Sequence, residues 1–263
     1  SETSGNATLG WTGWRAPNLT SANGILVAID GHIYNRTELR CVDGDNDAAL
    51  VSSLYAEHGF QNMLVKLNGD FTIAIYDPRV DTLWLARDRL GLKPMYYTPY
   101  CGGLAFASRP RALLSLPGVS SEANRRFVAL FAGSHYRYFD NDPDSSPYRD
   151  VFQLPAGHML RFQSHQIFKT AYWSLQDLPD FIEPEDELAE QYRDLLMDAV
   201  SLRLKTAERP AFTLSGGMDS SSVLACAVSA TGARQHAFSA VYEDETYDES
   251  HEIRSMLNSS VEC

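Results

Sequence analysis

The chain has 263 residues, and its 22 Lys and Arg against 34 Asp and Glu give a formal charge of −12. Hydrophobic residues make up 44% and charged residues 21%, which excludes a disordered or collagen-like chain. The length suits one or two domains. The acidic balance argues against non-specific nucleic-acid binding, which needs clustered Lys and Arg. It leaves open a small polyanion held by backbone N–H groups and a metal ion.

Cysteine usage and the absence of targeting segments predict a cytoplasmic protein. No apolar run approaches the length of a membrane span, and the polar start lacks a signal-peptide segment, so we expect no membrane partner. The first residue is Ser1, and we expect the chain to be a fragment of a longer one. The four cysteines form no CxxC pair, so free thiols are expected at Cys41, Cys101, Cys226 and Cys263.

The first half of the chain is rich in predicted strands. Residues 25–30 form an apolar run that should end in a turn at Gly31, and residues 47–58 have the spacing of an amphipathic helix that stops at Gly59. Many strands with one or two helices predict a layered α+β domain. The remaining strands are expected at 71–76, 82–86, 95–97, 104–107, 157–162 and 166–168.

The second half has the order of a parallel α/β domain. An acidic stretch with two prolines, 176–187, predicts a linker between a domain at 1–175 and another at 188–263. After a first helix, a strand, loop, helix and strand follow in turn, which is the start of a parallel sheet. These elements are expected at 188–200, 211–214, 215–220, 221–230 and 236–241.

The loop between the first strand and helix of that unit carries the chemistry. Two adjacent glycines, Gly216 and Gly217, let the backbone approach a ligand, and the following helix points free N–H groups into the loop. Hydroxyls from Ser215, Ser220 and Ser221 complete an anion cradle sized for phosphate. Asp219 would repel a phosphate, unless a bridging Mg²⁺ is held between them.

Other interpretations of this loop fit less well. A Walker A loop needs a Lys that is absent here, and a nucleophile elbow would need Gly in place of Thr213. A plain Gly-Gly turn with serine caps is the simplest alternative. Two glycines, three hydroxyls and an acid between strand and helix together favour the phosphate site.

The loop resembles the SGGxDS pyrophosphate loop of the N-type ATP pyrophosphatases, and the chain from about Ile25 onward resembles the asparagine synthetase family. Residues 25–35 (ILVAIDGHIYN) are similar to that family's strand and NGEIYN segment. Residues 86–97 (ARDRLGLKPMYY) are similar to its RDxxGxKPLYY. Further similarity lies in Asn46-Asp47, 67–71, 106–108 and 154–158.

The resemblance implies a glutaminase-type (Ntn-hydrolase-like) domain of layered sheets, followed by an α/β ATP pyrophosphatase domain. The latter would use ATP and Mg²⁺ to adenylate a carboxylate, so that an amine displaces AMP. By motif position the pyrophosphate contacts are Ser215, Gly216, Gly217, Asp219 and Ser220, with Asp219 as the metal ligand. Leu214 and the strand segment 238–241, which includes Ser239, correspond to the adenosine wall.

Residues 247–250 (YDES) have two interpretations of equal weight. They resemble the family's DE(S) segment after the second strand, or they are an exposed acidic helix start.

The glutaminase half departs from the family's pattern. No Cys lies near the start to act as the nucleophile. Asp30 replaces the Asn that donates to the oxyanion, and a carboxylate cannot donate. His32 and Arg109 replace two glutamates, and Asp47 is retained. We therefore expect a degenerate glutaminase whose site remnants are Asp30, Gly31, His32 and Asp47. His32 is either a catalytic base or, more simply, a turn histidine.

Members of the family with inactive glutaminase halves include β-lactam synthetases and lasso-peptide macrolactam synthetases. The resemblance therefore favours ring closure by an internal amine, or use of ammonia, over glutamine-driven asparagine formation. The substrate would be a small-molecule or peptide carboxylate, with a leader-peptide-binding partner if the protein is a peptide cyclase. The catalytic residues of the synthetase half stay unassigned. A non-enzymatic binding scaffold and a serine hydrolase using Ser215 are the other classes considered.

Overall fold

The computed structural model describes residues 1–12, 17–39, 46–133, 142–176, 183–207, 209–244, 246–257 and 261–262. The chain divides into two compact units, Ser1–Gln176 and Asp177–Cys263, each of which is described by itself. Among the helices of the described ranges, none has both the length and the apolar character that a membrane crossing requires. Cys101 and Cys226 are free thiols, whereas Cys41 and Cys263 lie outside the described residues.

The first unit is built on a six-stranded antiparallel sheet in the order β11, β10, β6, β5, β4, β3. Both faces of the sheet are buried at its centre. The side chains of β5 point alternately to the two faces and belong to two different apolar clusters. Ile73 and Ile75 belong to one cluster, and Ala74 and Tyr76 belong to the other. The strands are β3 (Leu19–Ala22), β4 (Ile25–Ile33), β5 (Gly69–Asp77), β6 (Thr82–Arg87), β10 (His158–Gln163) and β11 (Gln166–Ala171).

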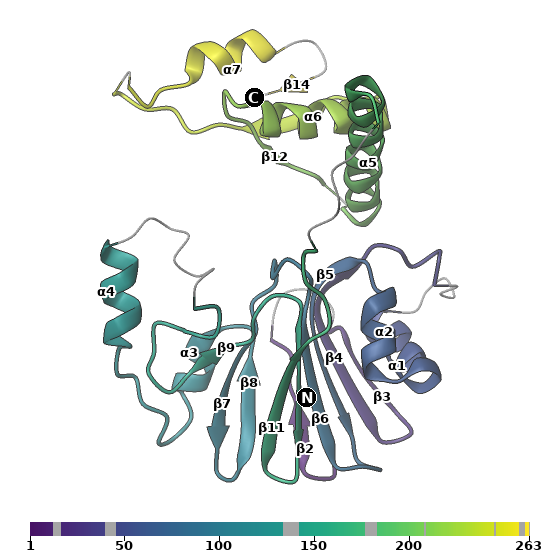
Figure 1. Ribbon diagram of the computed structural model, residues 1–263, viewed down its shortest axis with the longest axis vertical. Coiled ribbons are helices and arrows are strands. Elements are labelled where there is room, and N and C mark those ends of the chain that lie inside the picture. The colour runs from purple at the N-terminus through teal and green to yellow at the C-terminus, as the bar shows by residue number, and fades with distance from the viewer. Residues whose placement is uncertain are drawn as a thin grey trace. The chain divides into compact units, whose positions relative to one another are not determined.

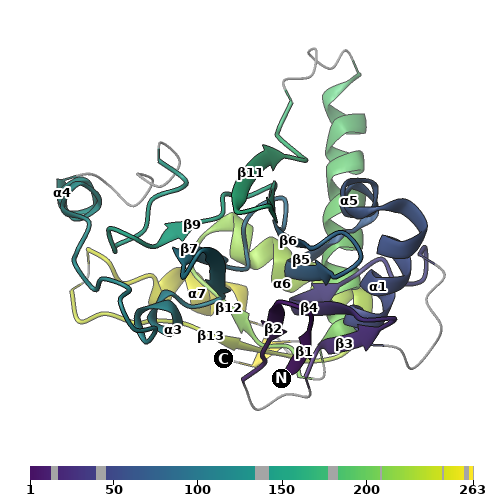
Figure 2. The ribbon, with the colours of Figure 1, turned by 90° about the horizontal axis from the view of Figure 1, so that it is seen from below.

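Helices cover one face of this sheet and a second, smaller sheet covers the other. The helices are α1 (Asp47–His58) and α2 (Phe60–Lys66), and the smaller sheet has the order β8, β7, β9. Figures 1 and 2 both place α1 beside β3 and β4, with β7 and α3 on the other side of the large sheet. This helix–sheet–sheet layering confirms the predicted α+β class. The remaining elements are β1 (Glu2–Ser4), β2 (Ala7–Leu9), β7 (Tyr96–Tyr100), β8 (Gly103–Ala107), α3 (Pro110–Leu114), α4 (Arg125–Gly133) and β9 (Phe152–Gln153).

The predicted helix at 47–58 is confirmed at both ends. The side chain of Asn46 caps it by accepting the N–H of Ala49 at 2.8 Å. Gly59 ends it with a φ of 73°, a backbone conformation that favours glycine. Leu50, Val51 and Leu54 are buried against the sheet, as the apolar spacing predicts.

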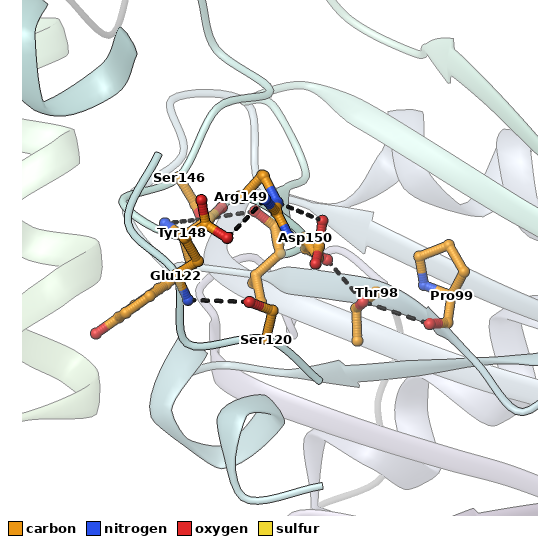
Figure 3. Close-up of polar contacts among 9 residues, drawn as sticks. Thr98, Pro99, Ser120, Glu122, Ser146, Tyr148, Arg149 and Asp150 are labelled. Atoms are coloured by element: carbon orange, nitrogen blue, oxygen red, sulfur yellow. Dashed lines mark hydrogen bonds and ion pairs between the residues drawn. The ribbon is translucent and has the colours of Figure 1, made fainter. Parts of the chain in front are cut away.

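Polar contacts hold the segment before β9 to the smaller sheet (Figure 3). The hydroxyl of Thr98 on β7 donates to the carbonyl of Asp150 at 2.7 Å, and Arg149 pairs with Glu122 at 2.6 Å. The buried hydroxyl of Ser146 donates to the carbonyl of Val151 at 2.6 Å. The polar residues of this loop therefore satisfy backbone groups that would otherwise be unpaired.

The second unit is a three-stranded parallel sheet in the order β12, β13, β14, with helices. Strands β12 (Phe212–Thr213) and β13 (Gln235–Phe238) flank α6 (Met218–Thr231), which packs against α5 (Glu185–Thr206). Helix α7 (Ser250–Met256) precedes β14 (Val261–Glu262). The predicted strand–loop–helix–strand order is confirmed. Helix α5 begins within the stretch 176–187 that was expected to be a linker.

A half-buried tyrosine in the first unit gives stability a defined pH dependence. The hydroxyl of Tyr55 donates to Asp77 at 2.9 Å, and burial, with this hydrogen bond second, raises the pKa of Tyr55 from 10.0 to about 12. The hydrogen bond from Arg79 lowers the pKa of Asp77. Since Tyr55 ionises more easily in the unfolded chain, its contribution is full below pH 10.0 and is lost as pH rises towards about 12.

We expect Tyr55→Phe to lower stability by about 1 kcal/mol at neutral pH, because a hydrogen bond is lost. The variant should then lose less stability than the wild type between about pH 9 and 11, as measured by melting temperature. Tyr192→Phe is the control, because that side chain is 68% exposed. Equal alkaline slopes for Tyr55→Phe and the wild type would contradict the assignment.

Candidate functional site

The turn from β12 into α6 is shorter than predicted. Helix α6 begins at Met218, so Met218, Asp219 and Ser220 form its first turn and only 214–217 form a loop. The prediction of a loop over 215–220 and a helix from Ser221 was therefore wrong at this boundary. An acid and a serine are poor residues for a helix interior, but the first turn suits them because its N–H groups carry partial positive charge.

Serine hydroxyls shape this turn. The Ser220 hydroxyl accepts the N–H of Ser215 at 3.1 Å and lies 2.9 Å from the Ser215 hydroxyl, which in turn accepts the N–H of Gly217 at 3.3 Å. No side chain caps α6 at Gly217. The amide groups that open the helix are therefore available to a ligand.

Leu214 and Ser239 hold the turn to the neighbouring strand. Leu214 is buried, and its N–H donates to the carbonyl of Phe238 at 2.9 Å. The hydroxyl of Ser239 donates to the carbonyl of Leu214 at 2.8 Å. The structure thus brings these two predicted residues together, at the edge where the parallel strands end.

Gly216 has little room for a side chain, because the start of α7 packs against it. A Cβ at this position would lie 3.0 Å from the Cβ of Glu252 and 3.3 Å from the Cβ of Glu249. The N–H of Gly216 donates to the carboxylate of Glu249 at 2.9 Å. Glu249 is the N-cap residue of α7, so the YDES segment is both a helix start and part of the loop's surroundings.

Glu249 was not among the predicted binding residues. The signal that could have found it is its place after the second parallel strand, because the carboxyl ends of parallel strands meet at one edge of a sheet. Asp219 was predicted in the loop, but it lies in the first turn of α6. Within the part of the chain that the structure describes, no three His, Cys, Asp or Glu side chains gather as a metal site.

An Mg²⁺ at Asp219 would therefore take most of its ligands from phosphate and water oxygens, which Mg²⁺ commonly does. The start of α6 fits such a ligand, because no side chain caps its opening amides, and Gly216 before it is packed so closely that a side chain would be crowded.

Three of the four residues predicted to be remnants of a glutaminase site, Asp30, Gly31 and His32, lie on a strand and not on a turn. Strand β4 continues through Asp30, Gly31 and His32 to Ile33, so the predicted turn after Asp30 was wrong, as was the turn-histidine interpretation of His32. Gly31 is required by a close approach instead: its φ is 140°, and a Cβ there would lie 1.9 Å from the carbonyl oxygen of Asp70 on β5. A glycine in a strand can thus mark two backbones in contact.

Asp30 forms an ion pair with Lys93, whose Nζ lies 3.1 Å from the carboxylate. The loop that brings Lys93 there is built by its own sequence. The Asp88 carboxylate accepts the N–H groups of Leu90, Leu92 and Lys93 at 2.9 to 3.1 Å. Lys93 had no predicted role, and only the fold reveals its proximity to Asp30.

Arg87 fixes the other side of the same loop. Its guanidinium donates to the carbonyls of Gly91, Lys93 and Leu154 at 2.5 to 2.9 Å, and burial lowers its pKa. Two carbonyls of the loop, and that of Leu154 beyond β9, thus depend on one side chain. Because that side chain is buried, its removal would leave them without a partner.

The retained Asp47 lies close to the end of β4. Its carboxylate is buried, pairs with Arg36 and accepts the N–H of Ile33 at 3.4 Å. The structure therefore places Asp30, Gly31 and His32 on one strand and joins Asp47 to the backbone of that strand.

A separate cavity of about 440 Å³ opens at the other end of β5, beside Tyr76, Asp81 and His165. It contains none of the predicted site residues, because Asp30 pairs with Thr72 near the start of β5. The predicted chemistry and this cavity are therefore distinct.

Comparisons with known proteins agree with both units. The family model described as a glutamine amidotransferase domain matches residues 12–173, and that described as asparagine synthase matches residues 191–259. A glutamine-hydrolysing asparagine synthetase of Bacillus subtilis is 31% identical over 227 residues, covering 79% of this chain and 30% of its own length.

A putative glutamine-hydrolysing asparagine synthetase of Methanocaldococcus jannaschii is 29% identical over 251 residues, covering 89% of this chain and 46% of its own length. Among solved structures, the glutamine phosphoribosylpyrophosphate amidotransferase of B. subtilis is 16% identical with a TM-score of 0.40, covering 88% of this chain and 49% of that one. The chain spans less than half the length of these relatives.

The layered sheets of the first unit are those of an Ntn-hydrolase-like glutamine amidotransferase domain, and the second unit is the start of a synthetase domain. The chain belongs to the asparagine synthetase family.

The contact at Gly31 gives a testable expectation. Gly31→Ala should lower the free energy of unfolding by about 3 kcal/mol or more, because the methyl group would overlap the Asp70 carbonyl. Gly118→Ala is the matched control: its φ is 85°, but nothing lies within 4 Å of a Cβ there, so only about 1 kcal/mol should be lost. Urea unfolding measures both, and similar losses would refute the close approach as the cause.

Proposed function

We propose that this chain is part of an ATP- and Mg²⁺-dependent amide synthetase that activates a carboxylate as an acyl-AMP and lets an amine displace AMP. The observation that carries the proposal is the start of α6 at Met218, which no side chain caps and which directly follows the closely packed Gly216. A carboxylate at neutral pH is a poor electrophile, so activation by adenylation is chemically reasonable.

The residues of the turn would act by binding and orienting. The opening amides of α6 would hold the departing pyrophosphate, and Ser215 and Ser220 would keep the turn in shape. Asp219 would hold the Mg²⁺, which neutralises phosphate charge when bound. Leu214, Phe238 and Ser239, at the ends of the parallel strands, would face the nucleoside.

We further propose that the amide nitrogen does not come from glutamine in this protein. Asp30 is a carboxylate paired with Lys93 where the family places an amide donor, so it would repel an oxyanion. Ring closure by an internal amine, as in β-lactam or macrolactam synthetases, or use of free ammonia, then remains. The acceptor would be a small-molecule or peptide carboxylate, with a leader-peptide-binding partner in the peptide case. The protein would act in the cytoplasm.

Glutamine-driven asparagine formation is the second candidate. It is favoured by the matched relatives, which are described as glutamine-hydrolysing asparagine synthetases. A nucleophilic cysteine contributed from outside the present sequence would be required.

The nucleotide site is tested by binding. We expect the chain to bind ATP with Mg²⁺ in calorimetry, and Asp219→Ala to weaken that binding by about tenfold or more because a metal ligand is lost. Asp198→Ala on α5 removes the same charge from an exposed position and should leave the affinity unchanged. Unaltered binding by Asp219→Ala would exclude the proposed metal role.

The nitrogen source is tested in the complete natural polypeptide that contains this sequence. We expect it to release no glutamate from glutamine, while ammonium or an amine substrate supports AMP formation from ATP. Glutamate release would be measured beside AMP formation in the same samples. AMP formation that requires glutamine, with matching glutamate release, would overturn the proposal in favour of the second candidate.

A further inference from the structure

In the proposed phosphate turn, one backbone amide already donates a hydrogen bond to a carboxylate of the chain itself. The N–H of Gly216 donates to Oε2 of Glu249 at 2.9 Å, across a separation of 33 residues in sequence. A carboxylate oxygen resembles a phosphate oxygen as an acceptor: both are anionic and both form charge-assisted hydrogen bonds with backbone amides. Glu249 therefore stands where a ligand oxygen would be expected.

The backbone of Glu249 is fixed, whereas its side chain is exposed. Ile253 on α7 is buried in one small core with Leu214 and Leu224, and its N–H donates to the carbonyl of Glu249 at 3.0 Å. The packing of Gly216 against the Cβ atoms of Glu249 and Glu252 holds α7 beside the turn. The carboxylate can thus leave Gly216 by side-chain rotation alone, without moving the helix.

The charges around the turn are those that oppose a free polyanion. Asp219 lies in the first turn of α6, and Glu249 and Glu252 lie on the adjoining start of α7. A metal-free pyrophosphate group would have to displace one carboxylate and approach the others. A ligand complexed with a divalent cation carries less negative charge and offers the released carboxylate a cation nearby.

We propose that Glu249 is an internal competitor for the pyrophosphate turn, and that it makes this site selective for metal-complexed over metal-free polyphosphate. The inference rests on the proposed function, since it concerns the same turn. Glu249 is a specificity-determining residue in this account. It acts by holding the Gly216 amide until a metal-bound polyphosphate replaces it.

The test is calorimetry of inorganic pyrophosphate with the full chain, with and without Mg²⁺. Glu249→Ala should bind metal-free pyrophosphate about tenfold more tightly than the wild type, because one competing charge-assisted hydrogen bond is removed. Adding Mg²⁺ should therefore increase the pyrophosphate affinity of Glu249→Ala by a smaller factor than it increases that of the wild type. Glu249→Gln keeps an acceptor oxygen without charge. Its affinity for metal-free pyrophosphate should lie between those of the wild type and Glu249→Ala.

Glu252→Ala is the matched control, since it removes the same charge one helical turn away. We expect it to change the affinity by less than about threefold through screened electrostatics alone. The side chain of Glu249 does not cap α7, so its removal should leave the fold intact, which the melting temperature checks. The amide resonance of Gly216 should shift in Glu249→Ala and stay in place in Glu252→Ala.

The outcomes separate this inference from the function on which it rests. If the wild type binds pyrophosphate with Mg²⁺ but Glu249→Ala binds the metal-free form no better, or Glu252→Ala gains equally, the competitor role is overturned and the nucleotide site stands. If neither protein binds pyrophosphate under either condition, both fail. Weaker Mg²⁺-dependent binding by Glu249→Ala, without tighter metal-free binding, would make Glu249 a metal ligand instead.

Discussion

One hydrogen bond connects two parts of the proposed phosphate site, the Gly216 amide and the Glu249 carboxylate. It joins the turn after the first parallel strand to the helix after the second. The turn can come that close to α7 because Gly216 has no side chain, and α7 stays there because Ile253 is buried with Leu214. The small core and the proposed ligand turn therefore depend on the same contacts.

Each candidate site contains a carboxylate that already has a partner within the chain: Asp30 pairs with Lys93, and Glu249 accepts the Gly216 amide. The two contacts differ in how firmly the surrounding structure holds them. Asp30 and Lys93 are each about one-third exposed, and the loop bearing Lys93 is fixed by Asp88 and Arg87. The Asp30–Lys93 pair is therefore held firmly by the fold. Glu249 lies on an exposed side chain beside a turn, where exchange for a ligand costs little. The two sites therefore differ in how firmly their charged side chains are held.

Local pattern predicted those parts of the fold that local forces determine. The helix at 47–58 was predicted from its apolar spacing and its Gly59 stop, and the structure adds the Asn46 cap in the same segment. The strand–loop–helix–strand order of the second unit was likewise visible, because apolar runs and glycines mark it directly. The family resemblance supplied the Ntn-hydrolase-like class, which periodicity alone could not.

Most errors concern residues whose surroundings are formed by a distant part of the chain. Gly31 was interpreted as a turn residue, but it is needed because the carbonyl of Asp70, 39 positions further on, leaves no space for a side chain. Lys93 could not be placed in sequence for the same reason, since its partner Asp30 lies on another element. Glu249 is marked in sequence by its position after the second parallel strand, but its contact with Gly216 appears only in the structure. The start of α6 was missed because Asp219 and Ser220 are weak helix formers, although the first turn of a helix favours them.

The acidic charge of the protein bears on how a polyphosphate could be held at all. With a net charge of −12, the chain offers a free polyanion little long-range attraction. Backbone amides carry only partial charge, and in the turn at 214–217 one of them is engaged by Glu249. Under the proposed function, binding would then depend on a cation that arrives with the ligand. Carboxylates near such a turn are therefore consistent with phosphate binding, because they attract the metal that the ligand requires.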